Sequence, residues 1–243
     1  MFQFFVEPEQ ITEENVTITG GDVNHIKNVL RMKKGEQVRI SDNCGGDYLC
    51  EITELTPEQI RLHILEKCDN TELPVKITLF QGLPKGDKME LIIQKAVELG
   101  VNEIVPVAMK NCVVKLDEKK AKAKQSRWQA IAESAAKQSK RSIIPKIGEV
   151  VSFSQAAAMA ENMAVKLVPY ENERGMAHTR EVFGKIPKGA DIAVFVGPEG
   201  GFASKEIELV REDMELVSLG NRILRTETAG LTALSMLIFA LEE

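Results

Sequence analysis

The sequence predicts an α/β protein of two domains: a small N-terminal β-barrel and a larger C-terminal domain built on a parallel sheet. Residues 1–70 contain short alternating strand patterns separated by turn clusters. Residues 75–107 contain a strand, an amphipathic helix and a second strand, which is the unit of a parallel sheet. The wholly apolar run Ile192–Val196 is typical of a strand that is buried on both faces. A chain of 243 residues is long enough for both parts.

In the N-terminal part, one helix is expected over about Asp22–Leu30. Asn70–Pro74 has the composition of a linker, so we expect domains at residues 1–70 and 74–243. The strands expected before the linker are Phe2–Val6, Glu36–Ser41, Tyr48–Leu55 and Gln59–Glu66.

In the C-terminal part, strands and helices alternate. Ser204 is expected to cap the helix that follows the central strand, with Glu206 in its first turn. The strands expected are Val75–Phe80, Glu103–Val107, Ala164–Pro169, Ile192–Val196 and Glu215–Leu219. The helices expected are Met89–Leu99, Lys119–Lys140, Ser152–Glu161, Thr179–Lys185 and Glu227–Glu242, the last apolar nearly all round and therefore expected in the core or against a partner.

Charge is distributed unevenly along the chain. The net formal charge is −5, but residues 110–146 hold 11 basic against 3 acidic residues. The segments before and after, residues 1–70 and 147–243, are each acidic. One cationic segment in an acidic chain is either a solvated helix face or a surface that binds a polyanion.

Cysteine and hydropathy patterns exclude several classes. The four cysteines form no CxxC pair and have no histidine at ligand spacing, so we expect reduced thiols and no metal. The longest apolar stretch, within Ala229–Leu241, is shorter than the roughly 20 residues of a membrane span. Met1–Val6 lacks the basic start of a signal peptide, so we expect a cytoplasmic protein.

Two glycine-bearing loops are the main candidate for a ligand site. Gly197–Gly201 follows the central strand, and Leu219–Ala229 follows the last one. Loops after parallel strands meet at one sheet edge, where ligands bind in open α/β sheets. Neither loop has the dinucleotide or P-loop pattern, which disfavours a nucleotide-dependent metabolic enzyme. Arg225, next to Glu227, has a guanidinium suited to phosphate or carbonyl oxygens.

These residues carry a family resemblance that covers essentially the whole chain. Gly197–Phe202, followed by Glu206, and Leu219–Ala229 resemble the two signature motifs of bacterial 16S ribosomal RNA (uracil-N3)-methyltransferases of the SPOUT superfamily. Further similar blocks are Gln81–Glu90, Gln94–Gly100 and His25–Arg31.

The resemblance implies a fold and a cofactor. The C-terminal domain would be a SPOUT α/β methyltransferase domain with a trefoil knot, and the N-terminal barrel would be PUA-like. The cofactor would be S-adenosyl-L-methionine, held by three loops. The cofactor-binding residues implied are Pro169, Tyr170, Gly197, Pro198, Glu199, Gly200, Gly201, Ser218, Leu219, Gly220, Ile223, Leu224, Arg225 and Thr228.

The resemblance also implies a substrate and partners. The target would be one uridine, at position 1498 of 16S ribosomal RNA in the small subunit, and the protein would be a homodimer. Arg225 would stabilise charge on the uracil, while Glu227 would either orient Arg225 or accept a proton. The RNA contacts expected are His25, Arg31, Lys85, Lys88, Arg127 and Arg141, although His25, Lys85 and Lys88 also fit as solvated surface groups.

Two other functions remain compatible with the same residues. A methyltransferase acting on another RNA nucleoside would use the same loops and basic segment. A ribosomal RNA-binding assembly protein that holds the cofactor without turnover would do so as well.

Overall fold

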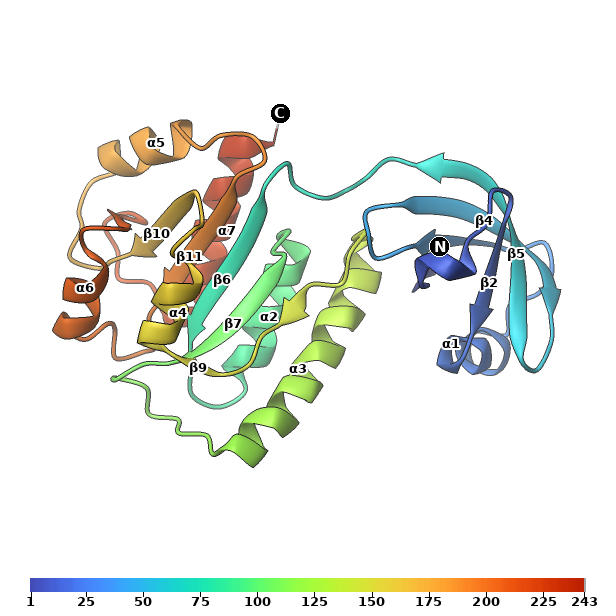
Figure 1. The fold of residues 1–243 in the computed structure, drawn as a ribbon, viewed down its shortest axis with the longest axis horizontal. Helices are drawn as coiled ribbons and strands as arrows, with labels where there is room; N and C mark the ends of the chain where they lie inside the picture. The colour runs from blue at the N-terminus through green and yellow to red at the C-terminus, as the bar shows by residue number, and fades with distance from the viewer. Residues whose placement is uncertain (243) are drawn as a thin grey trace. The chain divides into compact units, whose positions relative to one another are not determined.

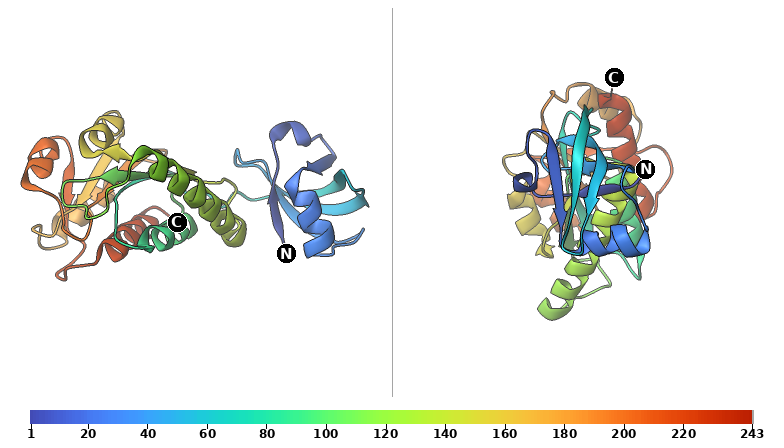
Figure 2. Two further views of the ribbon diagram at one scale, coloured as in Figure 1. Left: turned by 90° about the horizontal axis from the view of Figure 1, so that it is seen from below. Right: turned by 90° about the vertical axis from the view of Figure 1, so that its right-hand side faces the viewer.

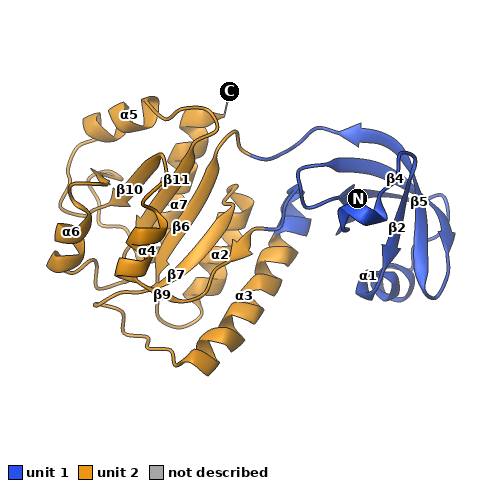
Figure 3. Ribbon diagram, viewed as in Figure 1, with its two compact units in different colours: residues 1–72, 136–144 blue, residues 73–135, 145–243 orange. Residues whose placement is uncertain are grey.

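The computed structural model describes residues 1–242, which divide into two compact units (Figure 3). Unit 1 comprises residues 1–72 and 136–144, and unit 2 comprises residues 73–135 and 145–243. Unit 1 is therefore assembled from two stretches of chain that are distant in sequence. The predicted α/β fold class, with a β-rich N-terminal part and a parallel-sheet C-terminal part, is confirmed.

Unit 1 is a curled sheet around an apolar core (Figure 1). Its strands run in the order β1-β3-β4-β5-β2, with β1 parallel to β3 and the other neighbours antiparallel. One helical segment, α1 (Gly21–Asn24) with a π-helical continuation to Val29, stands where a helix was predicted. The strands are β1 (Gln3–Phe5), β2 (Asn15–Thr19), β3 (Gln37–Ser41), β4 (Asp47–Leu55) and β5 (Gln59–Cys68).

Strand β2 was missed by the sequence analysis although its pattern is regular. Val16 and Ile18 are buried, while Asn15 and Thr19 are exposed. This alternation is typical of a strand with one face on a core. The strand is short and directly follows an acidic stretch, Glu13–Glu14, which masked the pattern.

A buried polar network holds residues 140–144 in unit 1. The Asp47 carboxylate, fully buried, pairs with Arg39 at 2.7 Å and accepts hydrogen bonds from the hydroxyls of Ser41 and Ser142. Charges removed from water this far need partners of this kind. Residues 140–144 are thus hydrogen-bonded to the sheet of unit 1 through the side chain of Ser142.

Unit 2 is a parallel sheet with helices on both faces (Figures 1 and 2). The strand order is β12-β10-β11-β6-β7-β8, and β9 also pairs with β7. The strands are β6 (Lys76–Gly82), β7 (Glu103–Ala108), β8 (Lys146–Ile147), β9 (Val151–Ser152), β10 (Val165–Pro169), β11 (Asp191–Val196) and β12 (Glu215–Val217). The helices are α2 (Lys88–Glu98), α3 (Glu118–Ser139), α4 (Phe153–Met159), α5 (Ala177–Gly184), α6 (Ser204–Val210) and α7 (Thr226–Leu241).

The centre of unit 2 lies where β6 and β11 pair. Phe80 and Phe195 are register partners, and their rings stack with centroids 4.4 Å apart. Phe153 of α4 meets Phe195 edge-on at 5.9 Å. Such pairs add roughly 0.5–1.5 kcal/mol beyond the burial of their area. Packing therefore fixes the strand from which the Gly197–Gly201 loop leaves.

Helix α6 begins one residue earlier than predicted. Its N-cap is Ala203, not Ser204, and the Glu206 carboxylate accepts a hydrogen bond from the Ala203 amide at 2.7 Å. The carboxylate thus satisfies the amide of the N-cap residue, which has no partner within the helix. The knot that the resemblance implies in the C-terminal domain stays a prediction.

Candidate active site

The loops after β10, β11 and β12 converge on one cavity of about 600 Å³. This volume is within the usual range for small-molecule sites. The cavity lies at the carboxyl ends of the strands, the edge that the sequence analysis selected. Its lining includes Pro169, Tyr170, Gly197, Pro198, Glu199, Gly201, Phe202, Ser218, Leu219, Gly220, Arg222, Ile223, Leu224, Arg225, Thr226 and Lys88.

The loop after β11, Gly197–Gly201, approaches its neighbours so closely that little room is left for a Cβ at Gly82 or Gly200. A Cβ on Gly82, at the end of β6, would lie 2.7 Å from the Pro198 nitrogen. A Cβ on Gly200 would lie 3.0 Å from Cβ of Asn111. Gly201 also has a positive φ of 66°, which favours glycine. These glycines are required by backbone approach and backbone conformation.

Two side chains connect the segment that follows β7 to the loop after β11 and to helix α6. The Asn111 amide donates to the carbonyls of Gly200 and Gly201 at 3.0 and 3.2 Å. The Glu206 carboxylate accepts from the Lys110 amide at 2.9 Å. Because these bonds satisfy backbone groups of a loop, they limit its freedom around the cavity.

A buried chain of hydrogen bonds joins the loop after β11 to α7. The Gln81 side chain donates to the Thr226 hydroxyl at 2.9 Å, and that hydroxyl donates to the Gly197 carbonyl at 2.7 Å. Gln81 is completely buried and Thr226 is 5% exposed. The chain sets the first turn of α7 against the loop after β11.

The loop after β12 is hydrogen-bonded to the start of α5. The Thr179 hydroxyl donates to the Ser218 carbonyl at 2.9 Å and accepts from the Ser218 amide at 3.0 Å. The Tyr170 amide donates to the Val217 carbonyl at 3.0 Å. The loops after β10 and β12 are thereby held together before any ligand arrives.

Three charged groups cluster beside the cavity. The Lys88 ammonium is 3.0 Å from Glu199 Oε1 and forms an ion pair with Glu227 Oε2 at 3.1 Å. The two carboxylates, first Glu199 and then Glu227, raise the pKa of Lys88. Burial raises the pKa of each carboxyl, but hydrogen bonds to its own backbone amide and the Lys88 charge outweigh burial, so both pKa values are lowered.

The structure brings most of the predicted cofactor residues to this cavity. Gly200 and Thr228 are the exceptions: Gly200 packs on Asn111, and Thr228 lines a separate groove. Of the predicted catalytic pair, Arg225 lines the cavity and Glu227 lines the groove. The two residues therefore face different spaces.

Several lining residues were missed by the sequence analysis. Phe202 and Thr226 were inside the quoted motifs but received no role, and Glu171–Arg174, which follow β10, received none either. Lys88 was assigned to RNA, whereas its ammonium contacts two carboxylates. The loop position of Lys88 in the sequence gave no signal for these partners.

The predicted RNA contacts fall into two groups. His25, Arg31, Lys85 and Arg127 are exposed, although Arg127 also pairs with Glu90 at 2.8 Å. Arg141 differs from the expectation because it is buried, with its guanidinium engaged by the carboxylate of Glu72. Its carbonyl also accepts from Gln3 at 2.6 Å. Arg141 therefore serves the packing of unit 1 in this structure.

An apolar groove of about 800 Å³ follows the exposed side of α7. Phe239 is 91% exposed and Leu91 of α2 is 46% exposed. Glu227 and Arg180 are the charged residues of its lining. The other side of α7 is in the core, where Leu234 and Leu237 are fully buried.

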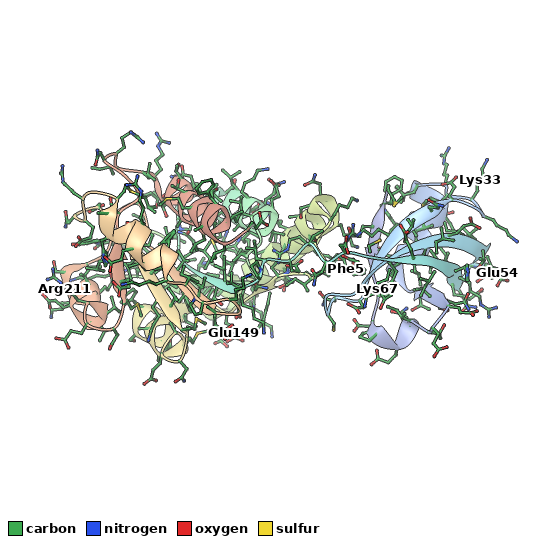
Figure 4. All side chains as sticks on the ribbon, turned by 90° about the horizontal axis from the view of Figure 1, so that it is seen from above. Phe5, Lys33, Glu54, Lys67, Glu149 and Arg211 are labelled. Carbon is green, nitrogen blue, oxygen red and sulfur yellow. The ribbon has the colours of Figure 1, made fainter. Side chains whose placement is uncertain are left out.

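Figure 4 shows the side chains of the described residues, with Lys33, Glu54 and Lys67 at the surface of unit 1. Within residues 1–242 no group of three or more His, Cys, Asp or Glu side chains is arranged to hold a metal ion. The same residues contain no helix long and apolar enough to span a bilayer.

Comparison with known proteins assigns the class. The family model of an RNA methyltransferase domain matches residues 71–238, and that of an RNA methyltransferase PUA domain matches residues 18–65. The parallel sheet, the cavity formed by three loops and both matches define an RNA methyltransferase with an appended PUA domain.

Individual relatives narrow the class to a family. The chain is 39% identical over 250 residues to ribosomal RNA small subunit methyltransferase E of Bacillus subtilis, covering 100% of this chain and 98% of that protein. A Neisseria gonorrhoeae structure of the same name, bound to S-adenosyl methionine, is 33% identical with a TM-score of 0.82, covering 98% of this chain and 97% of that one. A Legionella pneumophila putative methyltransferase with bound SAM gives 32% and 0.83 at the same coverage. The chain belongs to the ribosomal RNA small subunit methyltransferase E family.

Proposed function

We propose that this protein transfers a methyl group from S-adenosyl-L-methionine to N3 of uridine 1498 in 16S ribosomal RNA of the small subunit. The observation that carries the proposal is the convergence of three loops on one cavity in a chain of this family. Two structural relatives hold the same cofactor.

The residues present fit this cofactor. Gly220 has a positive φ of 111°, and no atom lies within 4 Å of the position its Cβ would take. That leaves open space beside the backbone of the third loop, so peptide groups there can approach a ligand. Pro169, Gly197 and Leu219 bring the three loops to the cavity. When bound, the cofactor supplies an electrophilic methyl group.

The chain's own task is to prepare the acceptor nitrogen. Uracil N3 carries a proton and becomes a good nucleophile only when that proton is removed. Arg225, exposed and lining the cavity, places a permanent positive charge where negative charge spreads onto the uracil oxygens. Glu227 has two candidate roles, proton acceptor or orienting partner of Arg225.

RNA binding is assigned to both parts of the chain. We place the PUA-like RNA-binding domain at residues 1–70 and the methyltransferase domain at residues 74–243, from which residues 136–144 pack in unit 1. His25 and Arg31 are the exposed candidates in the first, and Lys85 and Arg127 in the second. The basic helix α3 supplies further positive charge for phosphates.

We assign a second copy of this chain to the apolar groove along α7. Phe239 and Leu91 expose apolar surface of a kind that marks interaction sites. Glu227 and Thr228 line this groove, so a dimer would complete the surroundings of these residues. Because bacterial 16S ribosomal RNA is made and assembled in the cytoplasm, the proposed activity belongs there.

The test is methylation of small subunits and of free 16S RNA from a strain that lacks the modification. Labelled cofactor and mass analysis of nucleosides should show 3-methyluridine, and primer extension should place it at one site. A different methylated nucleoside would assign another target. Cofactor binding by calorimetry without any product would indicate an assembly protein.

A further inference from the structure

The ammonium of Lys88 connects two parts of the site. It donates a hydrogen bond to Glu199 Oε1 at 3.0 Å and forms an ion pair with Glu227 Oε2 at 3.1 Å. Glu199 lies in the Gly197–Gly201 loop, and Glu227 is the second residue of α7. One side chain on the first residue of α2 therefore joins a loop that lines the cofactor cavity to the last helix.

These contacts are partly sheltered from water. The exposed fractions of the Lys88, Glu199 and Glu227 side chains are 32%, 24% and 16%. The Lys85 amide also donates to Glu199 Oε1, at 3.1 Å, so the carboxylate is held from the backbone as well. Because water screens such a cluster less than a fully exposed ion pair, we expect its contacts to constrain the elements that carry them.

The position of Arg225 depends on the first turn of α7. Arg225 is the N-cap residue of this helix, and its carbonyl accepts a hydrogen bond from the Ala229 amide at 2.8 Å. Within residues 1–242 no hydrogen bond or ion pair joins the side chains of Arg225 and Glu227, which line different spaces. The covalent connection between the two residues is the backbone at the helix start, so a contact that holds Glu227 also holds that backbone.

The loop after β11 has a second attachment to α7. The Thr226 hydroxyl donates to the Gly197 carbonyl at 2.7 Å, at the beginning of the loop. Lys88 holds the loop two residues further along, at Glu199. Two attachments prevent the loop from turning relative to the helix, whereas the Thr226 bond alone would leave it free to turn about one point.

The surroundings of Lys88 are unfavourable for an RNA phosphate. Lys88 and its two carboxylate partners together carry a formal charge of −1. A phosphate would therefore meet the repulsion of two carboxylates as well as the attraction of one ammonium. The Lys85 side chain is exposed and forms no ion pair with another residue of the described chain, which makes it the better candidate for RNA.

We propose that Lys88 is a positioning residue that holds the Gly197–Gly201 loop and the start of α7 in the arrangement required for cofactor binding and methyl transfer. The inference rests on the proposed function and deepens it, because it specifies how Glu227 orients Arg225, through the helix start that Lys88 fixes. Lys88 is accordingly assigned to the internal structure of the site and not to RNA phosphates.

The experiment compares Lys88→Met, Lys88→Gln and Lys88→Arg with wild type. Cofactor affinity is measured by calorimetry without RNA, the single-turnover rate at saturating cofactor, and RNA affinity by filter binding, all below the onset of thermal unfolding. Lys95→Met is the matched control, because Lys95 is on the same helix, pairs with Glu98 at 2.8 Å and lines neither the cavity nor the groove. Lys85→Met is the comparison for RNA binding.

We expect Lys88→Met and Lys88→Gln to bind the cofactor about 10-fold more weakly, equivalent to about 1.4 kcal/mol. Their single-turnover rates should fall about 10- to 100-fold even at saturating cofactor, because Arg225 is displaced from the reacting uracil. Their RNA affinity should stay at the wild-type value. Lys88→Arg should keep most of the cofactor affinity and rate, since a guanidinium also offers several donors to the two carboxylates. Lys95→Met should behave like wild type.

Lys85→Met should show the opposite pattern, with weaker RNA binding and unchanged cofactor affinity. A double-mutant cycle separates positioning from a loss of stability alone, which would leave the cofactor affinity of the folded protein unchanged. In protein that carries Glu199→Gln and Glu227→Gln, Lys88 has lost both charged partners. Lys88→Met should therefore lower cofactor affinity much less in that background than in wild type.

Three results would overturn the proposal. The first is a Lys88→Met protein with the cofactor affinity and single-turnover rate of wild type. The second is an RNA affinity that falls as far in Lys88→Met as in Lys85→Met. The third is an equal effect of Lys88→Met with and without the two carboxylates. If wild-type protein binds the cofactor but forms no 3-methyluridine, the proposed function fails separately, and the calorimetric series still decides whether Lys88 positions the cofactor loop.

Discussion

The side-chain amide of Gln81 donates a hydrogen bond to the hydroxyl of Thr226 over 2.9 Å, although the two residues are 145 positions apart. Gln81 is the last residue but one of β6, and Thr226 begins α7. The bond thus fixes the start of α7 to strand β6. The position of Arg225, the preceding residue, depends on it.

Thr226→Val should therefore weaken both the fold and the site. The substitution keeps the shape but leaves the Gly197 carbonyl without its partner and removes one of the two acceptors of the buried Gln81 amide, which still donates to the Gly82 carbonyl. We expect a cost of about 1–3 kcal/mol. Urea unfolding and calorimetric titration of the cofactor measure the two effects. Ser126→Ala on α3 removes an exposed hydroxyl that donates to the Lys122 carbonyl within the same helix and should change little. Equal stability of both variants would contradict the prediction.

Gly82→Ala should displace the loop after β11. The added methyl would meet the Pro198 nitrogen at 2.7 Å, and backbone cannot move aside as a side chain can. Overpacking of this kind costs about 1–3 kcal/mol. We expect a lower melting temperature and weaker cofactor binding. Gly21→Ala, where no atom lies within 4 Å of the added Cβ, is the stability control and should melt like wild type.

Arg225→Ala should lower turnover by about 100- to 1,000-fold, because a fixed charge aimed at the developing oxyanion is lost. Its guanidinium is exposed and makes no hydrogen bond to another described residue, so the fold should not suffer. Single-turnover rates with saturating cofactor measure the effect, while calorimetry should still detect cofactor binding. Turnover near the wild-type rate would remove Arg225 from the chemistry.

Asp47→Ala should destabilise unit 1 by about 3–5 kcal/mol, since it leaves the partner of a buried ion pair unsatisfied. Hydrogen bonding to Asp47 raises the pKa of Arg39 even though burial opposes it, so Arg39 would remain charged without its partner. Chemical unfolding, monitored by a spectroscopic signal from residues of unit 1, measures this loss of stability. Glu54→Ala breaks the exposed pair with Arg61 and should cost well under about 1 kcal/mol.

The Lys88 cluster predicts a pH window of stability. Both carboxyls have a pKa lowered from 4.5, so their contribution is complete above pH 4.5 and is lost as the pH falls through the folded-state values. Lys88 has a pKa raised from 10.5, so its contribution is lost only as the pH rises beyond that value. Lys88→Met should therefore be less stable than wild type at pH 7, with the difference shrinking at pH 3. A difference that is the same at both pH values would contradict this.

Local patterns were sufficient for most elements of the fold. Val75–Phe80 is apolar except for Lys76 and Thr78, and Ile192–Val196 is wholly apolar; both patterns are typical of buried strands, and both form the centre of the sheet as predicted. Strands β8 and β9 have two residues each, too few for any periodicity, and were missed. The cap of α6 was misplaced because Ser204 is a good cap by type, whereas Glu206 reaches the Ala203 amide instead.

The candidate site was predictable in its backbone and not in its ion pairs. The glycines after β11 and β12 mark loops at one sheet edge, and the structure joins these loops in one cavity. The partners of Lys88 and Arg141 lie 111 and 69 positions away, and nothing in the sequence pairs them. The family resemblance suggested RNA contacts for both residues, but distance in the folded chain decides which opposite charge each one meets.

The division of the chain has a consequence for its synthesis. The N-terminal unit includes residues 136–144, where Ser142 bonds to Asp47 and the Arg141 carbonyl accepts from Gln3. A nascent polypeptide that has emerged only as far as Glu72 lacks this last piece. In that polypeptide Asp47 has not yet met the hydroxyl of Ser142, which is translated after residues 73–135 of the second unit. The N-terminal unit therefore cannot be completed on the ribosome until synthesis of the second unit has begun.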